Sequence, residues 1–94
     1  MSKRDKLRQR LRNNPKGVRF SDLETLLLAF GFVLVRVSGS HHIFQYNDGK
    51  VESILVLPIH GNRVKTPYVR DAIELLDRLF PEAQSSLDKG GDDE

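Results

Sequence analysis

The chain has 94 residues, of which 15 are Lys or Arg, 13 are Asp or Glu and none is Cys. Such a length holds one domain with one hydrophobic core, and the lack of cysteine excludes a disulfide framework and a thiolate metal site. The longest apolar runs fall far short of the roughly 20 residues that cross a bilayer. No apolar segment follows the charged N-terminus as it would in a signal peptide. We therefore expect a soluble cytoplasmic protein without membrane contact.

The net charge of +2 conceals an uneven distribution along the chain. Residues 1–19 carry a net charge of +7, residues 20–80 of −1 and residues 81–94 of −4. A basic segment favours a polyanion such as RNA as its partner, although a solvated helix that aids solubility would have the same composition. The chain thus divides into a basic N-terminal extension (1–19), a domain (20–80) and an acidic tail (81–94). The tail is rich in Ser, Gly and Asp and is expected to be disordered.

Two helices are expected before any strand. Two leucines that lie four residues apart among basic residues predict a short helix over residues 4–13. Ser21, followed three positions later by Glu24, is the signature of a capping box, in which the serine caps the helix and the glutamate reaches back to it. Apolar residues at helical spacing follow. An amphipathic helix is therefore expected from this cap to Gly31, because glycine commonly ends helices.

Three strands are expected in the middle of the chain, at residues 32–37, 41–46 and 51–57. Their content of β-branched and aromatic residues is typical of strands. Asp48 and Gly49 predict a tight type I′ hairpin turn, because both residue types tolerate positive φ. Pro58 is expected to end the third strand, which leaves residues 60–63 as a loop.

A last helix completes the pattern, with Thr66 as N-cap, Pro67 at the first helical position and Pro81 after its end. The order helix, helix, three strands, helix indicates an α+β two-layer sandwich of the double-stranded-RNA-binding-domain type. In it, two helices pack on a three-stranded antiparallel sheet, and the N-terminal helix is additional. The expected core consists of Leu23, Leu26, Leu27, Phe30, Phe44, Val56, Ile73 and Leu76.

The three histidines of the chain lie in two short segments at the ends of expected strands. Neighbouring residues of a strand face opposite sides. His42 therefore shares a face with Phe44 and Tyr46 and is expected to be a half-buried, hydrogen-bonded core residue, whereas His41 points outward. RNA cleavage without a metal needs one group that accepts the 2′-OH proton and one that protonates the leaving 5′-oxygen, and histidine does both near neutral pH. Spacing alone leaves the role of His41 open, because an exposed strand histidine often has none.

Two further residues are candidates for contact with phosphate. His60 follows Pro58 and is a second proton carrier, a phosphate ligand or simply a solvated residue. Lys65 precedes the last helix, where free N–H groups and the helix dipole attract anions, although an ordinary surface lysine would occupy the same position. No metal-ligand spacing such as His-x₃-His appears, so neither a metal site nor a cofactor is expected.

Several motifs follow one another in a recognisable order. They are a helix that ends in Gly31-Phe32, the element Gly39-Ser40-His41-His42-Ile43-Phe44, a hairpin at Asp48-Gly49, the element Leu57-Pro58-Ile59-His60 and a closing helix after Lys65. In this order and layout they resemble the HicA family, the toxins of bacterial and archaeal type II toxin–antitoxin systems. The resemblance covers residues 20–80.

The resemblance implies a ribonuclease that cuts mRNA and a HicB-like antitoxin that covers its active site. The family's essential histidine follows the glycine-serine pair and corresponds to His41. Because some members carry an extra residue there, His42 is a second candidate. With no metal site in the sequence, we expect a metal-independent endoribonuclease. The candidate RNA-binding residues are Gly39, Ser40, Arg63 and Lys65.

Two features depart from the family pattern: the extension over residues 1–19, and a last helix that carries Asp71, Glu74 and Asp77 where family members are often more basic. Two alternatives to an enzyme follow. One is a non-catalytic RNA-binding module of the same fold, whose histidines contact phosphate or ribose. The other is a module that only holds its antitoxin, which the acidic helix favours. The Gly-Ser setting of His41 favours the enzyme.

Overall fold

The computed structural model describes residues 2–81, so the tail expected to be disordered lies, from residue 82 onward, outside the described residues. Its elements confirm the α+β class. In chain order they are α1 (Lys3–Asn13), β1 (Val18–Arg19), α2 (Phe20–Ala29), β2 (Val33–Ser38), β3 (His41–Asn47), β4 (Glu52–His60), β5 (Arg63–Val64) and α3 (Thr66–Leu79).

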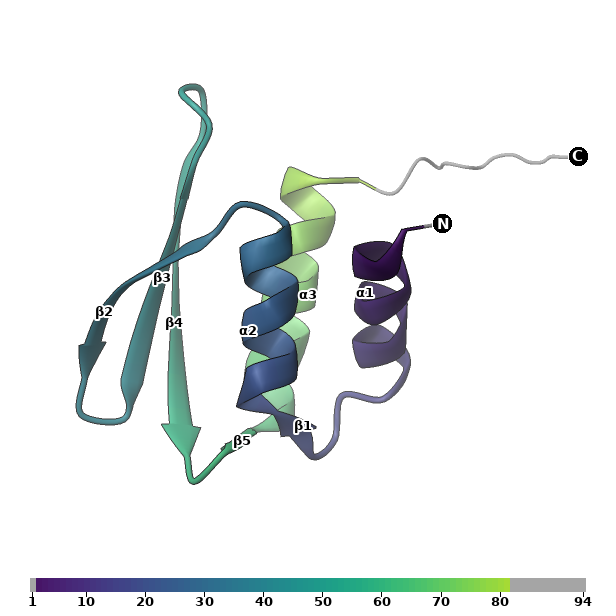
Figure 1. Ribbon diagram of the computed structural model, residues 1–94, viewed down its shortest axis with the longest axis vertical. Helices are drawn as coiled ribbons and strands as arrows, with labels where there is room; N and C mark the ends of the chain where they lie inside the picture. The colour runs from purple at the N-terminus through teal and green to yellow at the C-terminus, as the bar shows by residue number, and fades with distance from the viewer. Residues whose placement is uncertain (1, 82–94) are drawn as a thin grey trace, which may run out of the picture.

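The elements form three layers (Figure 1). Helices α2 and α3 lie between the sheet and α1, and α1 contacts both of them. Among residues 2–81, no helix lies on the opposite face of the sheet. The short strands β1 and β5 lie at one end of the helix layer, whereas α1 begins near the other end.

The sheet has five antiparallel strands in the order β1-β5-β4-β3-β2, so the expectation of three strands is wrong. Strands β1 and β5 have two residues each, too short for the alternation that marks a strand in a sequence. They form because each buries one valine: Val18 lies opposite Val64, which in turn lies opposite Ile59. All three side chains are buried. The pairing attaches the N-terminal extension to the sheet.

Strand β4 continues through Pro58 to His60, so this proline does not end it and His60 does not lie in a loop. Ile59 donates its backbone N–H to the Ser40 carbonyl oxygen at 2.8 Å. This bond makes His41 and Pro58 a directly opposed pair without hydrogen bonds between them. The proline therefore costs no ladder bond towards β3, and β5 begins to pair with β4 only one residue later.

Helices α2 and α3 begin before their expected starts, α2 by two residues and α3 by one. Arg19 is the N-cap of α2, and no side chain caps that end, so the capping box at Ser21 and Glu24 does not form. The reason is that β1 runs directly into the helix, which places Ser21 inside its first turn. Lys65 is the N-cap of α3, and Thr66 is already helical.

The hairpin between β3 and β4 has a longer loop than a two-residue type I′ turn. Asn47 and Glu52 are the last paired residues, which leaves four residues between the strands. The Asp48 carboxylate accepts the backbone N–H groups of Lys50 and Val51, both at 2.9 Å. These bonds hold the loop in a conformation that the residue pair Asp-Gly alone does not specify.

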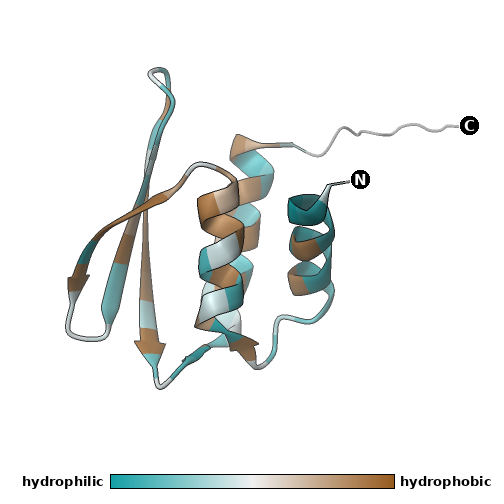
Figure 2. Cartoon of the chain, viewed as in Figure 1, coloured by the Kyte–Doolittle hydropathy of each residue, from teal (hydrophilic) through white to brown (hydrophobic). Residues whose placement is uncertain are grey.

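The hydrophobic core lies between the sheet and helices α2 and α3. Seven of the eight expected core residues are buried, and Val56 is the exception at 43% exposure. Leu55 and Leu57 of β4 point inward, so Val56 between them faces the open side. Residues 54–59 are apolar at every position. No alternation of apolar and polar residues therefore predicted which face of the sheet Val56 occupies. Figure 2 shows apolar residues on the strands as well as on the helix layer.

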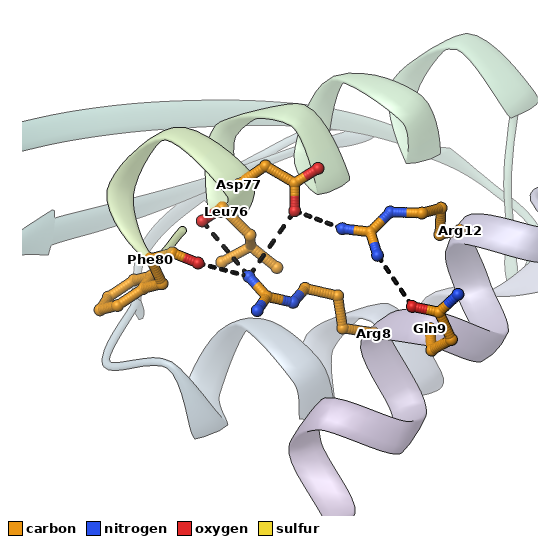
Figure 3. A network of polar contacts seen from close by, with 6 residues as sticks. All are labelled: Arg8, Gln9, Arg12, Leu76, Asp77 and Phe80. Carbon is orange, nitrogen blue, oxygen red and sulfur yellow. Dashed lines mark hydrogen bonds and ion pairs between the residues drawn. The ribbon is translucent and has the colours of Figure 1, made fainter. Parts of the chain in front are cut away.

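Helix α1 is held to α3 mainly by Arg8, which is only 3% exposed. Its Nη1 donates to the Phe80 carbonyl oxygen at 2.9 Å and to that of Leu76 at 3.4 Å (Figure 3). The Phe80 carbonyl lies just past the end of α3, where no further helical turn supplies a donor, whereas the Leu76 carbonyl also accepts the Phe80 N–H at 2.7 Å. Arg8 and Arg12 both form ion pairs with Asp77. Within residues 2–81, no helix combines the length and the apolar character needed to cross a membrane.

Candidate active site

The face of the sheet that the helices leave open carries apolar and polar side chains in rows across β2, β3 and β4. Directly opposed residues share a face, and the rows on this face are Val33, Gln45 and Ile54; Arg36, Ile43 and Val56; and Ser38, His41 and Pro58. Val33 and Ile54 are each more than half exposed. The open face is therefore an apolar surface with His41 at one end.

His41 is the first residue of β3 and is exposed on the open face, as strand alternation predicted. It lies between Ser38 of β2 and Pro58 of β4. Because His41 and Pro58 form a pair without hydrogen bonds, their Cα atoms approach to about 4.5 Å. The proline ring is rigid, so it limits the positions that the imidazole adopts on that side.

His60 is also exposed and lies on the same face, two residues beyond Pro58 in β4. Since Pro58 is directly opposite His41, His60 is the diagonal neighbour of His41. Diagonal neighbours have Cα atoms about 7–8 Å apart, within reach of each other's side chains. The fold thus brings together the two histidines that the sequence placed in separate segments.

His42 faces the opposite way, towards the helices, and is half-buried. Its ring centroid lies 4.6 Å from that of Phe20, and its Nδ1 lies 3.4 Å from the Ser40 carbonyl oxygen. Leu57 of β4 is directly opposite it. These contacts give His42 the position in the core that strand alternation predicted and keep it from the open face.

The glycine-serine pair before His41 forms the turn between β2 and β3. Gly39 has φ of 58°, a left-handed conformation that glycine adopts without strain. The Ser40 carbonyl oxygen accepts the Ile59 N–H at 2.8 Å, which ties the turn to β4. This motif therefore fixes where β3 begins, and with it the position of His41.

His60, Arg63 and Lys65 border one open hollow of about 440 Å³ at the start of α3. Gly17 of the N-terminal extension lines the same hollow and accepts a hydrogen bond from Arg63 Nη1 at 2.7 Å. Three of the side chains singled out from the sequence thus border one hollow, and one of them, His60, is the diagonal neighbour of His41. All three are exposed and cationic or able to become so.

Arg19 also lies in this region, although the sequence did not indicate it as a candidate site residue. It lies directly opposite Arg63 across β1 and β5, and Arg63 lies directly opposite His60 across β5 and β4. The available signal was the pair of short segments Val18-Arg19 and Arg63-Val64, in which a valine and an arginine alternate in mirror order. Two residues are too few to identify strands from sequence, so the pairing came only from the structure.

Two clear shifts in pKa lie at the hairpin tip, at the other end of β3 from His41. The N–H groups of Val51 and Lys50 hold the pKa of Asp48 below its ordinary value. Partial burial, together with the hydrogen bond that the Tyr46 hydroxyl donates to Asp48, raises the pKa of Tyr46. These groups stabilise the loop. Within residues 2–81, no three His, Asp or Glu side chains gather where they could hold a metal ion.

The segment from α2 into α3 matches a family of toxins from bacterial toxin–antitoxin systems, over residues 20–77. That family is the HicA toxin, and because the match covers more than half of the 94 residues, the chain belongs to the HicA family. No curated protein and no solved structure matches the chain. Helix α1 and strand β1 lie outside the matched segment.

Proposed function

We propose that this HicA-family toxin is a metal-independent endoribonuclease that cuts mRNA, and that His41 and His60 exchange protons with the substrate. One observation carries the proposal: the two histidines are diagonal neighbours on the open face of the sheet. Family membership supports a toxin. The order of α2, β2, β3, β4 and α3 supports a double-stranded-RNA-binding-domain-like arrangement of this segment.

The proposed reaction needs one histidine in the neutral form and one in the protonated form. The neutral imidazole takes the proton of the 2′-OH, and the 2′-oxygen attacks the adjacent phosphorus. The bond from phosphorus to the 5′-oxygen breaks, and the protonated imidazole gives its proton to that oxygen. The products are a 2′,3′-cyclic phosphate and a free 5′-OH. A diagonal Cα separation of about 7–8 Å leaves room for the phosphodiester between the two rings.

Substrate binding follows from the charges around the pair. Arg63 and Lys65 border the hollow next to His60, and Lys65 stands at the N-terminus of α3, where N–H groups and the helix dipole attract phosphate. Gly39 and Ser40 form the turn beside His41, where a backbone without large side chains lets a nucleotide approach. His42 is too enclosed to take part and is assigned to the core.

A HicB-like antitoxin is the proposed protein partner, and it would cover the open face. Support comes from the family and from the exposed side chains of Val33, Ile54 and Val56. Exposed apolar side chains gathered on one face commonly mark a protein interaction site. A partner seated there would also block His41, which lies at the end of the same face.

The test compares wild type with His41→Ala, His60→Ala and Ser38→Ala in growth, RNA cleavage and thermal melting. Both histidine variants should remain folded and lose about 10²–10⁴-fold in cleavage rate, the scale of one acid or base group. Ser38→Ala is the matched control, because Ser38 is exposed directly beside His41. It should cut RNA at nearly the wild-type rate. Wild-type cleavage should persist in the presence of a chelator.

Several outcomes would decide against the proposal. Undiminished cleavage by a folded His41→Ala protein would show that His41 does not transfer protons in the reaction. Full activity of His60→Ala would show that His60 is not the second proton carrier. His60 would then be a phosphate ligand or a solvated residue without a role. Loss of cleavage on chelation would exclude metal independence. If wild type bound RNA without cutting it, the non-catalytic RNA-binding module would replace the enzyme.

A further inference from the structure

We propose that Arg19 and Arg63, in one row with His60, contact RNA phosphates and lead the substrate backbone to the His41–His60 pair. The inference rests on the proposed RNA substrate, but it concerns binding and not the chemical step. The three residues are directly opposed across β1, β5 and β4, so they share one face of the sheet, and all are exposed. Strands lie about 4.8 Å apart, so the row spans about 10 Å and ends beside His41.

The row is electrostatically unfavourable in the protein alone. Like charges directly opposite each other in a sheet destabilise it, and Arg19 faces Arg63 in this way. Arg19 is also the N-cap of α2, where the helix dipole disfavours a cation. Within residues 2–81, no carboxylate forms an ion pair with either arginine, since the nearby Asp22 pairs with Arg10 at 3.6 Å. A bound phosphate would relieve both repulsions.

Other cations of the extension are already engaged elsewhere. Arg8 and Arg12 bind Asp77 and the end of α3. Arg4 lies 4.6 Å from the centre of the Phe30 ring and donates to a backbone carbonyl. The positive charge of residues 1–19 is therefore not a uniform RNA-binding arm.

The cations near the row add to its potential. Lys16 and Arg19 line a second hollow with Arg63, of about 250 Å³, at the junction of the extension and β5. This hollow shares Gly17 and Arg63 with the one that His60 and Lys65 border. Cationic side chains thus extend from the extension to the histidine pair, and the one carboxylate of the second hollow, Asp22, pairs with Arg10. Helix α3, by contrast, exposes Asp71 and Glu74. The extension supplies the polyanion contacts that this acidic helix lacks.

The test measures the affinity of a short single-stranded oligoribonucleotide over roughly 0.05–0.2 M salt. All proteins carry His41→Ala, so that the oligonucleotide stays intact. The slope of log K against log salt is about −0.7 per phosphate contact on a single strand. The double variant Arg19→Gln, Arg63→Gln should therefore flatten the slope by about 1.4 and weaken binding roughly tenfold at low salt.

The matched control is Lys3→Gln, Lys6→Gln, which removes the same charge from exposed residues at the far end of α1. It should leave the slope nearly unchanged. Since Arg63 also holds Gly17, its loss could loosen β1, so Arg19→Glu provides an independent arm. That change replaces a like-charge pair by an opposite-charge pair and suits the N-terminus of α2. The melting temperature should rise while RNA affinity falls.

Opposite signs of these two effects identify a contact with RNA, because a purely structural residue would lose stability and affinity together. Unchanged affinity of Arg19→Glu would overturn the proposal, and so would an equal loss in the control pair. Failure of the catalytic proposal gives a different result: wild type would leave RNA uncut, while the salt slopes would still separate the row variants from the control.

Discussion

His41 and His42 are neighbours in the chain, yet they lie on opposite faces of the sheet. One residue of offset exchanges these faces, so the assignment of roles depends on the register of β3. Phe44 fixes that register because it is fully buried. His42 lies two positions before Phe44 and therefore faces the same side of the sheet. The Gly39-Ser40 turn then leaves His41 as the first outward residue of the strand. Side-chain alternation therefore separates the candidate catalytic histidine from the structural one.

His42→Ala should lower the stability of the fold by about 1 kcal/mol, the scale of a stacked aromatic pair together with its buried area. The change removes the ring that packs on Phe20 and leaves RNA cleavage intact in molecules that remain folded. Thermal melting measures the effect, and His41→Ala is the control, since an exposed residue should change melting very little. A His42→Ala protein that melts like wild type but no longer cuts RNA would reverse the two assignments.

At the scale of elements, the stability of the β3–β4 hairpin depends on the backbone conformation of its loop. Gly49 has φ of 90°, and no atom lies within 4 Å of a Cβ built there. A substitution at this position is therefore penalised by backbone conformation alone. Gly49→Val should cost about 1–2 kcal/mol, whereas Gly49→Asn should cost less, because asparagine tolerates positive φ better. Chemical denaturation of both variants measures the difference. Equal stability of wild type and Gly49→Val would show that the loop adopts another conformation.

Asp48 makes the same loop sensitive to pH. Hydrogen bonds from Val51 and Lys50 lower its pKa from the ordinary 3.8. The folded protein thus binds this proton less readily than the unfolded chain does. The stabilisation is complete above the unfolded pKa and disappears as the pH falls through the lower folded pKa. Asp48→Asn should therefore lower the melting temperature at neutral pH, and the deficit should shrink as the pH falls below 3.8. If the loss in melting temperature did not change with pH, the cause would be the altered shape of the side chain and not the loss of its charge.

The elements that the sequence predicted are those long enough to carry a recognisable composition or spacing. Helices α2 and α3 have apolar residues at helical spacing, and strands β2, β3 and β4 are rich in β-branched and aromatic residues. Strands β1 and β5 were missed because two residues carry no period, and the end of β4 was missed because a proline usually ends a strand. Whether Pro58 disrupts pairing depends on which side its missing N–H faces, and that depends on the partner strands.

For the candidate site, the sequence predicted the direction of His41 and the burial of His42, but not the neighbours of His41. Its diagonal partner His60 belongs to a strand that extends past Pro58. The Arg19–Arg63 pair requires contact between segments far apart in the chain. Such contacts depend on tertiary packing, which local composition does not encode.

At the scale of the whole molecule, the family domain forms two layers and the N-terminal extension adds a third. Helix α1 lies alongside α2 and α3 on the side away from the sheet (Figure 1). Its buried residues are Arg8 and Leu11. After the helix, the chain crosses to β1 and joins the sheet at the edge nearest His60. The extension thus has a structural half, over residues 3–13, and a half that reaches the candidate site, over residues 16–19.

Removal of residues 1–14 should distinguish the structural role of residues 3–13 from the proposed RNA-binding role of residues 16–19. The truncated chain loses the burial of Leu11, worth about 1.5–3 kcal/mol, and the Arg8 bonds to the end of α3. It should therefore melt at a lower temperature than the full chain. Where both proteins are folded, the truncated chain keeps Arg19 and Arg63, so it should retain most of the salt dependence of RNA binding. Unchanged melting would show that α1 is not part of the fold. A folded truncated protein whose binding no longer responds to salt would place the RNA contacts on α1 itself, as a uniform basic arm would require.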